Sequence, residues 1–400
     1  MMDASRKNVF SVSFSQFGNA FSSNFVQIFF PFYILNISTY PLQYTLLWTG
    51  AIMGAASLCA AITSPFWGSL AHRFSPKILY LRSLLVNVIS FFLMGFTTDI
   101  HLLFTLRVIQ GLAAGTSTIG LIIISASSTK ENISSDLGLF QSSMTLGQLL
   151  GPLFGSLAAA TFGYKGSFVA ASCVVFSSFI FGNLYIMKLP PLPRKEGASG
   201  RTALDKRLLV AGFLCFTAMV QMTFLPSVLP NVFDSFQYEH ATALRLAGTV
   251  VLCYTATAMI GIHVWSRLSR RIGLHRMITL LVILGILLQA LLAFSRGVID
   301  FTIIRMLQTG FVAATFSLVI SIFAKGSKGS TLGFLSATRF AGNALGPILA
   351  TSILAYTNLA SVYFFISGIT LLAFLGFRAV FDPSSLRPQN RSDGTGGETA

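Results

Sequence analysis

The chain carries little charge. Of its 400 residues, 12 are Asp or Glu and 27 are Lys or Arg, so that 10% are charged, against about 25% in an ordinary soluble domain. It also lacks a phosphate-binding loop, a Ser/His/Asp set and a dinucleotide fingerprint, which argues against an ATP-driven pump and against an enzyme. We therefore expect no enzymatic activity and no cofactor.

Cysteine is equally scarce. Cys59, Cys173, Cys215 and Cys253 all fall inside apolar stretches, and their positions do not have the spacing of metal ligands. Packing is the expected role of such residues, in preference to disulfide or metal chemistry. We expect no metal site.

Long apolar runs are abundant instead. Hydrophobic residues make up 54% of the chain, and the mean hydropathy is +0.74. Stretches of about 20 apolar residues, long enough to cross a hydrocarbon core of ~30 Å as a helix, recur from Ser11 almost to Phe381. We count twelve, which predicts an all-α integral membrane protein with twelve transmembrane helices, embedded in the lipid bilayer.

The net charge of +15 would suggest nucleic acid in a soluble protein. Its distribution suggests something else, because with a cytoplasmic N-terminus only Lys165, Arg245 and Arg296 among the loop cations lie outside. This asymmetry follows the positive-inside rule. It predicts a multi-pass protein of the cell inner (plasma) membrane with both termini in the cytoplasm, and no nucleic-acid partner.

One polar segment, MKLPPLPRKEGASGRTALDKR at 187–207, divides the spans six and six. We predict an N-terminal six-helix bundle at 1–186, a cytoplasmic linker at 187–207, a C-terminal six-helix bundle at 208–381 and a disordered cytoplasmic tail at 382–400.

Three pairs of segments repeat across this linker. WGSLAHRF at 67–74 aligns with WSRLSRRI at 265–272, and RVIQ at 107–110 with RMLQ at 305–308, both at an offset of 198. GQLLGP at 147–152 aligns with GNALGP at 342–347, at an offset of 195. The repeats predict two pseudo-symmetric bundles with a substrate site between them, near mid-membrane.

The first span, FSQFGNAFSSNFVQIFFPFY at 14–33, has two faces. At about 100° per residue, Phe14, Phe17, Phe21, Phe25, Phe29 and Phe32 share one side of a helix. The opposite side carries Gln16, Asn19, Ser23 and Gln27. We predict that this amide face looks into a central, water-accessible cavity. The alternative is that the amides only hydrogen-bond a neighbouring helix.

Several motifs resemble those of a known family. GSLAHRFSPK at 68–77 is similar to the first signature of the major facilitator superfamily, RVIQG at 107–111 to its fourth-span signature, and GQLLGPLFG at 147–155 to a motif associated with antiporters. The chain most closely resembles the branch of twelve-span drug:proton antiporters, which implies the major facilitator fold and alternating access.

The resemblance also implies a set of gating or conformational residues: Gly68, His72, Arg73, Lys77, Gly147, Gly151, Pro152, Gly155, Arg271, Gly346 and Pro347. The glycines at 147, 151 and 155 recur on one helix face and allow close backbone approach, while Pro152 permits a bend. A hinge and a static packing seam are both consistent with this spacing.

Two features depart from the family pattern. The acidic position of the first signature is His72, with Arg270 as its counterpart in the second half, so a gate carboxylate is missing there. No acidic residue falls deep in a span, whereas Arg107, Arg305 and Arg339 do, and the cost of a buried charge predicts that they face inward.

These observations predict a substrate-binding set of polar side chains: Gln16, Asn19, Ser23, Gln27, Arg107, Gln110, Gln221, Gln308 and Arg339. We expect a monomeric secondary transporter that exports small amphipathic compounds, with the proton as a candidate coupling ion. An importer or facilitator of an anionic metabolite is the first alternative. A non-transporting membrane receptor or scaffold is the second.

Overall fold

The structure is a computed structural model that describes residues 4–129, 131–191, 205–323 and 329–381. These residues form helices and no strand. The N-terminal half contains α1 (Ala4–Ile37), α2 (Leu42–Leu70), α3 (Pro76–Met94), α4 (Ile100–Leu112), α5 (Thr116–Ser127) and α6 (Ile133–Tyr185). The C-terminal half contains α7 (Lys206–Thr223), α8 (Leu225–Ser235), α9 (His240–Ile272), α10 (Leu274–Leu291) with the short η1 (Leu292–Phe294), α11 (Val298–Val312), α12 (Thr315–Phe323), α13 (Gly329–Tyr356) and α14 (Leu359–Phe381).

Ten of the described segments are long and apolar enough to cross a membrane. One of them, the 53-residue α6, bends at Gly163, where φ is +69°. Ser178 and Gly147, on opposite sides of this bend, both contact α1 at Phe17 and Gly18, so α6 is a hairpin that crosses twice. The second crossing of α6 raises the count from ten to eleven. The 28-residue α13, which carries the GNALGP segment, is the twelfth, so the predicted twelve crossings are confirmed.

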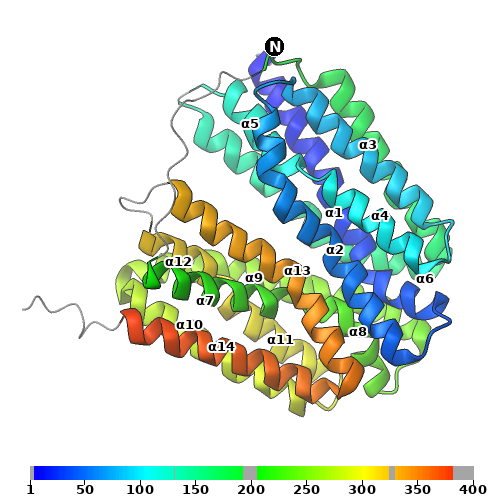
Figure 1. Cartoon of the computed structure of the whole chain (residues 1–400), viewed down its shortest axis with the longest axis vertical. Helices are drawn as coiled ribbons and strands as arrows, with labels where there is room; N and C mark the ends of the chain where they lie inside the picture. The colour runs from blue at the N-terminus through cyan, green and yellow to red at the C-terminus, as the bar shows by residue number, and fades with distance from the viewer. Residues whose placement is uncertain (1–3, 130, 192–204, 324–328, 382–400) are drawn as a thin grey trace, which may run out of the picture.

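The crossings build two bundles, shown in Figure 1 in blue to green and in green to red. Within the first, α1 packs along α6 and α2 along α4; within the second, α7 packs along α13 and α9 along α11. This is the predicted pair of pseudo-symmetric six-helix bundles. The predicted tail at 382–400 and residues 192–204 of the predicted linker lie outside the described residues.

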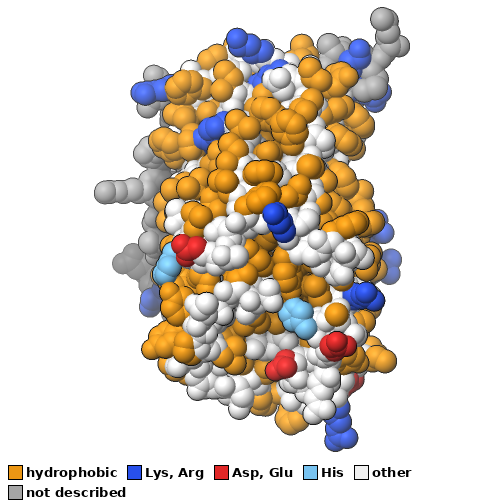
Figure 2. Space-filling model, turned by 90° about the vertical axis from the view of Figure 1, so that its right-hand side faces the viewer, with side chains coloured by type: hydrophobic (Ala, Val, Ile, Leu, Met, Phe, Trp, Pro, Cys, Tyr) orange, Lys and Arg blue, Asp and Glu red, His pale blue; other side chains and the backbone are white. Residues whose placement is uncertain are grey.

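Large hydrophobic side chains cover much of the outer surface. Ile62 is 72% exposed, Phe162 74% and Leu372 66%. Figure 2 shows one face on which hydrophobic side chains dominate, with the visible acidic and histidine side chains in the lower half of the view. A soluble monomer does not expose apolar surface on this scale, so the natural surroundings of this surface are hydrocarbon.

The phenylalanine face of α1 is turned away from lipid over most of its length. Phe25, Phe29 and Phe32 are 6%, 0% and 1% exposed, and the Phe29 ring packs edge-on against Phe168 of α6 at 5.0 Å. Only the first turns differ, with Phe14 44% exposed. The sequence correctly separates the two faces of α1, but the aromatic face is the one that binds α6.

Glycines bring α6 close to α1. A Cβ at Gly147 would lie 2.6 Å from the Phe17 carbonyl oxygen, and a Cβ at Gly151 would lie 2.6 Å from that of Phe21. Gly155 repeats the contact one turn further on. Because real side chains do not tolerate such separations, glycine is required along this seam.

The second half repeats the seam. A Cβ at Gly342 of α13 would lie 2.6 Å from the Phe216 carbonyl oxygen of α7, and Gly346 approaches Thr223 and Val220 of the same segment. The GQLLGP and GNALGP repeats therefore perform the same packing role in both bundles.

We predict that Gly151→Leu destabilises the protein by about 1–3 kcal/mol, because α1 must move to admit the side chain. Gly138→Leu is the matched control, since a Cβ at Gly138 meets no atom within 4 Å. Thermal unfolding in detergent should show a clear loss for the first variant and little change for the second. Equal melting temperatures would contradict the seam.

Candidate functional site

The two bundles touch at one end. We call this end the far side; it carries the connections at 38–41, 95–99, 236–239, 295–297 and 357–358 and the bend at Gly163. The opposite end, the termini side, carries the first turn of α1 and the end of α14. Figure 1 shows the bundles converging where α2, α8 and α13 meet and diverging toward the termini side.

Glycines again form the contacts between bundles. On α2, Gly50 contacts Pro347 and Thr351 of α13, and Gly54 contacts the Ala344 carbonyl oxygen. On α9, a Cβ at Gly248 would lie 2.6 Å from the Pro152 carbonyl oxygen of α6. The two predicted conformational prolines, Pro152 and Pro347, thus lie at the two places where the bundles press together.

An aromatic cluster adds to the far-side contact. The His240 imidazole of α9 lies 2.7 Å from the Tyr164 hydroxyl of α6, and its ring meets Phe32 of α1 edge-on at 5.6 Å. Sequence reasoning missed this contact, because its two residues are 76 positions apart and meet only through the packing of α6 against α9.

The amide face of α1 is divided between two environments. The Gln16 amide donates to Ser117 of α5 at 3.2 Å, and the Asn19 amide donates to Thr116 at 3.1 Å. Both side chains are buried, whereas Ser23 and Gln27 are half-buried. Gln16 and Asn19 therefore make the interhelical bonds of the alternative interpretation, and Ser23 and Gln27 keep accessible surface.

Arg305 is fully enclosed in the C-terminal bundle. Its guanidinium donates to Gln308 at 2.7 Å and to the Met222 carbonyl at 3.3 Å, and it lies over the Phe224 ring at 5.0 Å. Gln308 in turn donates to Gln221 at 2.6 Å. The structure thus brings Gln221 and Gln308 together, at a position without exposed surface in this conformation.

Arg107 is the equivalent residue of the first half, and 8% of its surface is exposed. It donates to Gln110 at 3.4 Å and lies over the Phe30 ring at 4.4 Å. The sequence correctly placed both arginines inside the protein. In both halves an aromatic face and a glutamine three residues along the same helix receive the charge.

Arg339 has a different environment. It is half-buried on α13, over the rings of Phe316 at 5.1 Å and Phe340 at 5.4 Å. Each described acidic residue lies in a connection or in the first or last turn of a helix: Asp99, Glu131, Asp136, Asp205, Asp234, Glu239 and Asp300.

The remaining predicted gate residues lie on the termini side. His72, Arg73 and Arg271 are exposed there, while Gly68 is half-buried near Thr118. The Lys77 ammonium donates to the Asn183 carbonyl at the end of α6, at 2.7 Å. This bond joins the first turn of α3 to the last turn of α6, where a cation is favourable.

Two tryptophans cap broken spans. The fourth span is interrupted between α4 and α5, and the Trp67 indole donates to the Leu112 carbonyl at 2.8 Å. The tenth is interrupted between α11 and α12, and Trp265 donates to the Gly310 carbonyl at 2.9 Å. The two donors are 198 residues apart, and so are the two acceptors. The repeated Trp in WGSLAHRF and WSRLSRRI was the signal that could have identified them.

Arg82 supports only the first of these breaks. It donates to the Ala113 carbonyl at 2.8 Å and lies over the Trp67 ring at 3.2 Å. The equivalent position in the second half is Leu280, so the break in the tenth span lacks the counterpart of this arginine.

Comparison with known proteins defines the class. The sequence model of the Major Facilitator Superfamily matches residues 12–306 and 212–398. The chain belongs to this superfamily; it is a multi-pass membrane transporter of small molecules and not an enzyme.

Two relatives and two solved structures illustrate the similarity. The chain is 28% identical to the uncharacterized MFS-type transporter YuxJ of Bacillus subtilis, covering 86% of this chain and 90% of that protein. It is 26% identical to the multidrug resistance protein MdtG of Klebsiella pneumoniae, covering 92% and 90%. Its fold is similar to that of the nucleoside transporter NupG, with a TM-score of 0.75 and 16% identity over 95% of this chain and 100% of that chain. It is also similar to a POT family peptide transporter, with a TM-score of 0.77 and 12% identity over 93% of this chain and 96% of that chain.

We predict that single cysteines at Ser23 and Gln27 react with a water-soluble thiol reagent, because both positions keep accessible surface toward the polar side of α1. A cysteine at Phe25 should remain unlabelled, since that side chain is 6% exposed. Cysteines at Gln16 and Asn19 should react slowly. Equal labelling at positions 23 and 25 would contradict the two-faced environment of α1.

A second prediction concerns the far-side cluster. Tyr164→Phe removes the bond to His240, and one hydrogen bond is worth about 1 kcal/mol, or about a fivefold shift of an equilibrium. A cysteine at Thr351, fully buried beside Gly50, should then be labelled about fivefold faster from the far side. Tyr185→Phe, at the exposed end of α6, is the control and should leave the labelling rate unchanged. An unchanged labelling rate in Tyr164→Phe would refute the role of the Tyr164–His240 bond in holding the far side closed.

Proposed function

We propose that the protein is a secondary active exporter of small amphipathic compounds in the cell inner membrane, with both termini in the cytoplasm. The observation that carries the proposal is the pair of pivots: the bundles press together on the far side at Gly248 with Pro152 and at Gly50 with Pro347. Two rigid bundles that meet at paired pivots can rock about a central site. In this orientation the structure is closed to the outside.

Two observations support export as the proposed direction of transport. The 147–155 segment resembles an antiporter motif, and it forms the α1–α6 seam whose last turns reach the pivot. The relative from Klebsiella pneumoniae is named a multidrug resistance protein. Export by alternating access agrees with both.

The proposed site lies between the bundles, where Ser23 and Gln27 of α1 keep accessible surface and Arg339 is half-buried. We include Arg107 because it retains some exposure. Gln110 belongs to the site as the hydrogen-bond partner of Arg107. We include Gln16, Asn19, Gln221 and Gln308 as supporting residues, whose hydrogen bonds hold neighbouring helices of each bundle together. Weakly polar, aromatic surroundings suit varied amphipathic molecules.

Charge narrows the substrate class. Arg107 and Arg339 lie at depth, and the acidic residues of the described chain lie near helix ends. A permanent cation would meet repulsion that a low local dielectric strengthens. Neutral or anionic amphiphiles are therefore the proposed substrates, and proton coupling would use Asp136, His72 or an ionisable group of the substrate.

The same arginines favour a second candidate, an importer or facilitator of an anionic metabolite. The two candidates agree in substrate charge and differ in direction. A non-transporting receptor would show saturable ligand binding without flux.

The test is flux in proteoliposomes of defined orientation, with matched cationic, neutral and anionic amphiphiles and with or without a pH gradient. We expect outward transport of neutral or anionic compounds, and a severalfold weaker preference for anions in Arg107→Gln and Arg339→Gln. Arg245→Gln is the matched control, because this exposed arginine lies at the far-side end of α9.

Inward flux would favour the second candidate, and binding without flux the receptor. A native preference for monovalent cations, unchanged in both arginine variants, would show that these residues do not set selectivity.

A further inference from the structure

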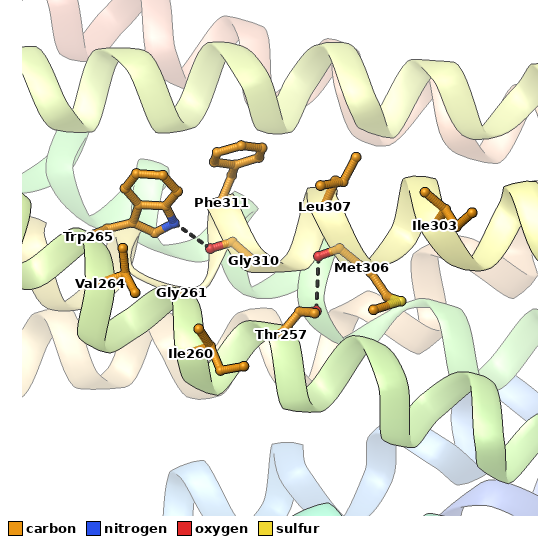
Figure 3. A pocket seen from close by; sticks show the side chains of 10 residues that line it. All are labelled: Thr257, Ile260, Gly261, Val264, Trp265, Ile303, Met306, Leu307, Gly310 and Phe311. Atoms are coloured by element: carbon orange, nitrogen blue, oxygen red, sulfur yellow. Dashed lines mark hydrogen bonds between the residues drawn. The ribbon is translucent and has the colours of Figure 1, made fainter.

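A groove with a volume of about 300 Å³ lies between α9 and α11 (Figure 3). Ile260 and Val264 of α9 are 63% and 46% exposed, and Ile303 and Leu307 of α11 are 52% and 49% exposed. At 100° per residue, Gly248, which meets the other bundle, lies about 120° around α9 from Ile260. The groove therefore opens to the outer, lipid-facing surface of the C-terminal bundle.

The polar atoms in the groove are already bonded. The Thr257 hydroxyl donates to the Met306 carbonyl at 3.0 Å, and the Trp265 indole donates to the Gly310 carbonyl at 2.9 Å. Figure 3 shows both bonds between the facing helices. The other lining residues are apolar side chains and glycine. Such walls favour binding of an apolar ligand over a ligand that requires hydrogen bonds.

Two residues that line the groove are smaller than their counterparts in the first half. At the offset of 198, the first half has Leu112 where the second has Gly310, and Phe66 where the second has Val264. The Trp-to-carbonyl bond is the same in both halves. The backbone arrangement is thus shared, and the second half has smaller side chains at these two positions.

Two cations continue the exposed stripe of α9. Steps of three or four residues lead from Ile260 through Val264 to Arg267 and Arg271, all exposed. At 1.5 Å per residue the two arginines lie about 4.5 Å and about 10.5 Å beyond Val264 along the helix. This places positive charge at the end of the groove nearest the membrane surface.

We propose that the groove holds one acyl chain of an anionic phospholipid, with its phosphate bound by Arg267 and Arg271. An acyl chain gains little by moving from bilayer to groove, so the charge on the headgroup must supply the selectivity. Two arginines near the surface give a preference for anionic over zwitterionic lipid on the order of tenfold to thirtyfold. The site is independent of the transported compound.

The lipid would touch the break of the tenth span. Gly310 lies two residues before the end of α11 at Val312, and α12 begins at Thr315. Where the fourth span has Arg82 beside its break, the tenth span would have a lipid chain.

The experiment uses the full chain in vesicles that contain phosphatidylglycerol or phosphatidylcholine with a photoactivatable group in one acyl chain. Adducts are mapped by peptide mass spectrometry. We expect them to concentrate on α9 and α11 around Val264 and Leu307, with roughly tenfold more adduct from phosphatidylglycerol. Arg267→Gln combined with Arg271→Gln should abolish the headgroup preference.

Gly310→Leu should remove the groove adducts. A Cβ at Gly310 has its nearest neighbour, the Thr257 carbonyl oxygen, at 3.6 Å, so the backbone can accept the side chain that the first half has. Gly368→Leu on α14 is the control, because a Cβ there meets no atom within 4 Å. Val264→Phe fills the groove by a second route should Gly310→Leu fail to fold.

Adducts spread evenly over other exposed positions such as Phe92 and Leu372 would mean that ordinary boundary lipid covers the groove, and would overturn the proposal. So would unchanged groove adducts in a folded Gly310→Leu or Val264→Phe variant. A headgroup preference that survives the double arginine variant would refute the phosphate site.

Discussion

The interior of a bilayer supplies no hydrogen bonds, so every polar group at depth must be satisfied by the protein itself. This constraint explains the most specific features of the structure. Arg107 and Arg305 each use a glutamine on the next turn and an aromatic face. The interrupted fourth and tenth spans expose carbonyl groups, and Trp67 and Trp265 cap them. These donors help the membrane interior to tolerate the two interruptions.

The two halves share the same helix packing and differ in the side chains around it. Gly147 and Gly342 bring equivalent pairs of helices into backbone contact, which gives each bundle a rigid seam. Differences arise in the side chains placed on this common frame: Arg82 supports the break in the first half, whereas Gly310 and Val264 leave a groove in the second. Rigid bundles with different outer surfaces can rock as units while each keeps its own contacts with lipid.

Hydropathy and the repeats were sufficient to predict the twelve crossings, the two bundles and the inward arginines, because span length and the cost of buried charge act on each segment separately. Periodicity also separated the two faces of α1. Periodicity alone could not predict which helix packs against each face. Gln16 and Asn19 bond α5, and Phe29 packs on α6. The far-side contact of His240 with Tyr164 and the groove beside Trp265 depend on how helices from distant segments pack, which no local pattern encodes.

The motion proposed for this protein is a rocking of two rigid bundles about the far-side pivots. Pairs of spin labels test it most directly, one pair across the far side at Thr39 and Thr357 and one across the termini side at Ser69 and Arg267, all exposed positions. Distances measured by pulsed electron spin resonance in lipid nanodiscs should show two populations for each pair, with the short far-side distance accompanying the long termini-side distance. A single distance for both pairs, unchanged by pH or by added amphiphile, would contradict alternating access and favour a static receptor.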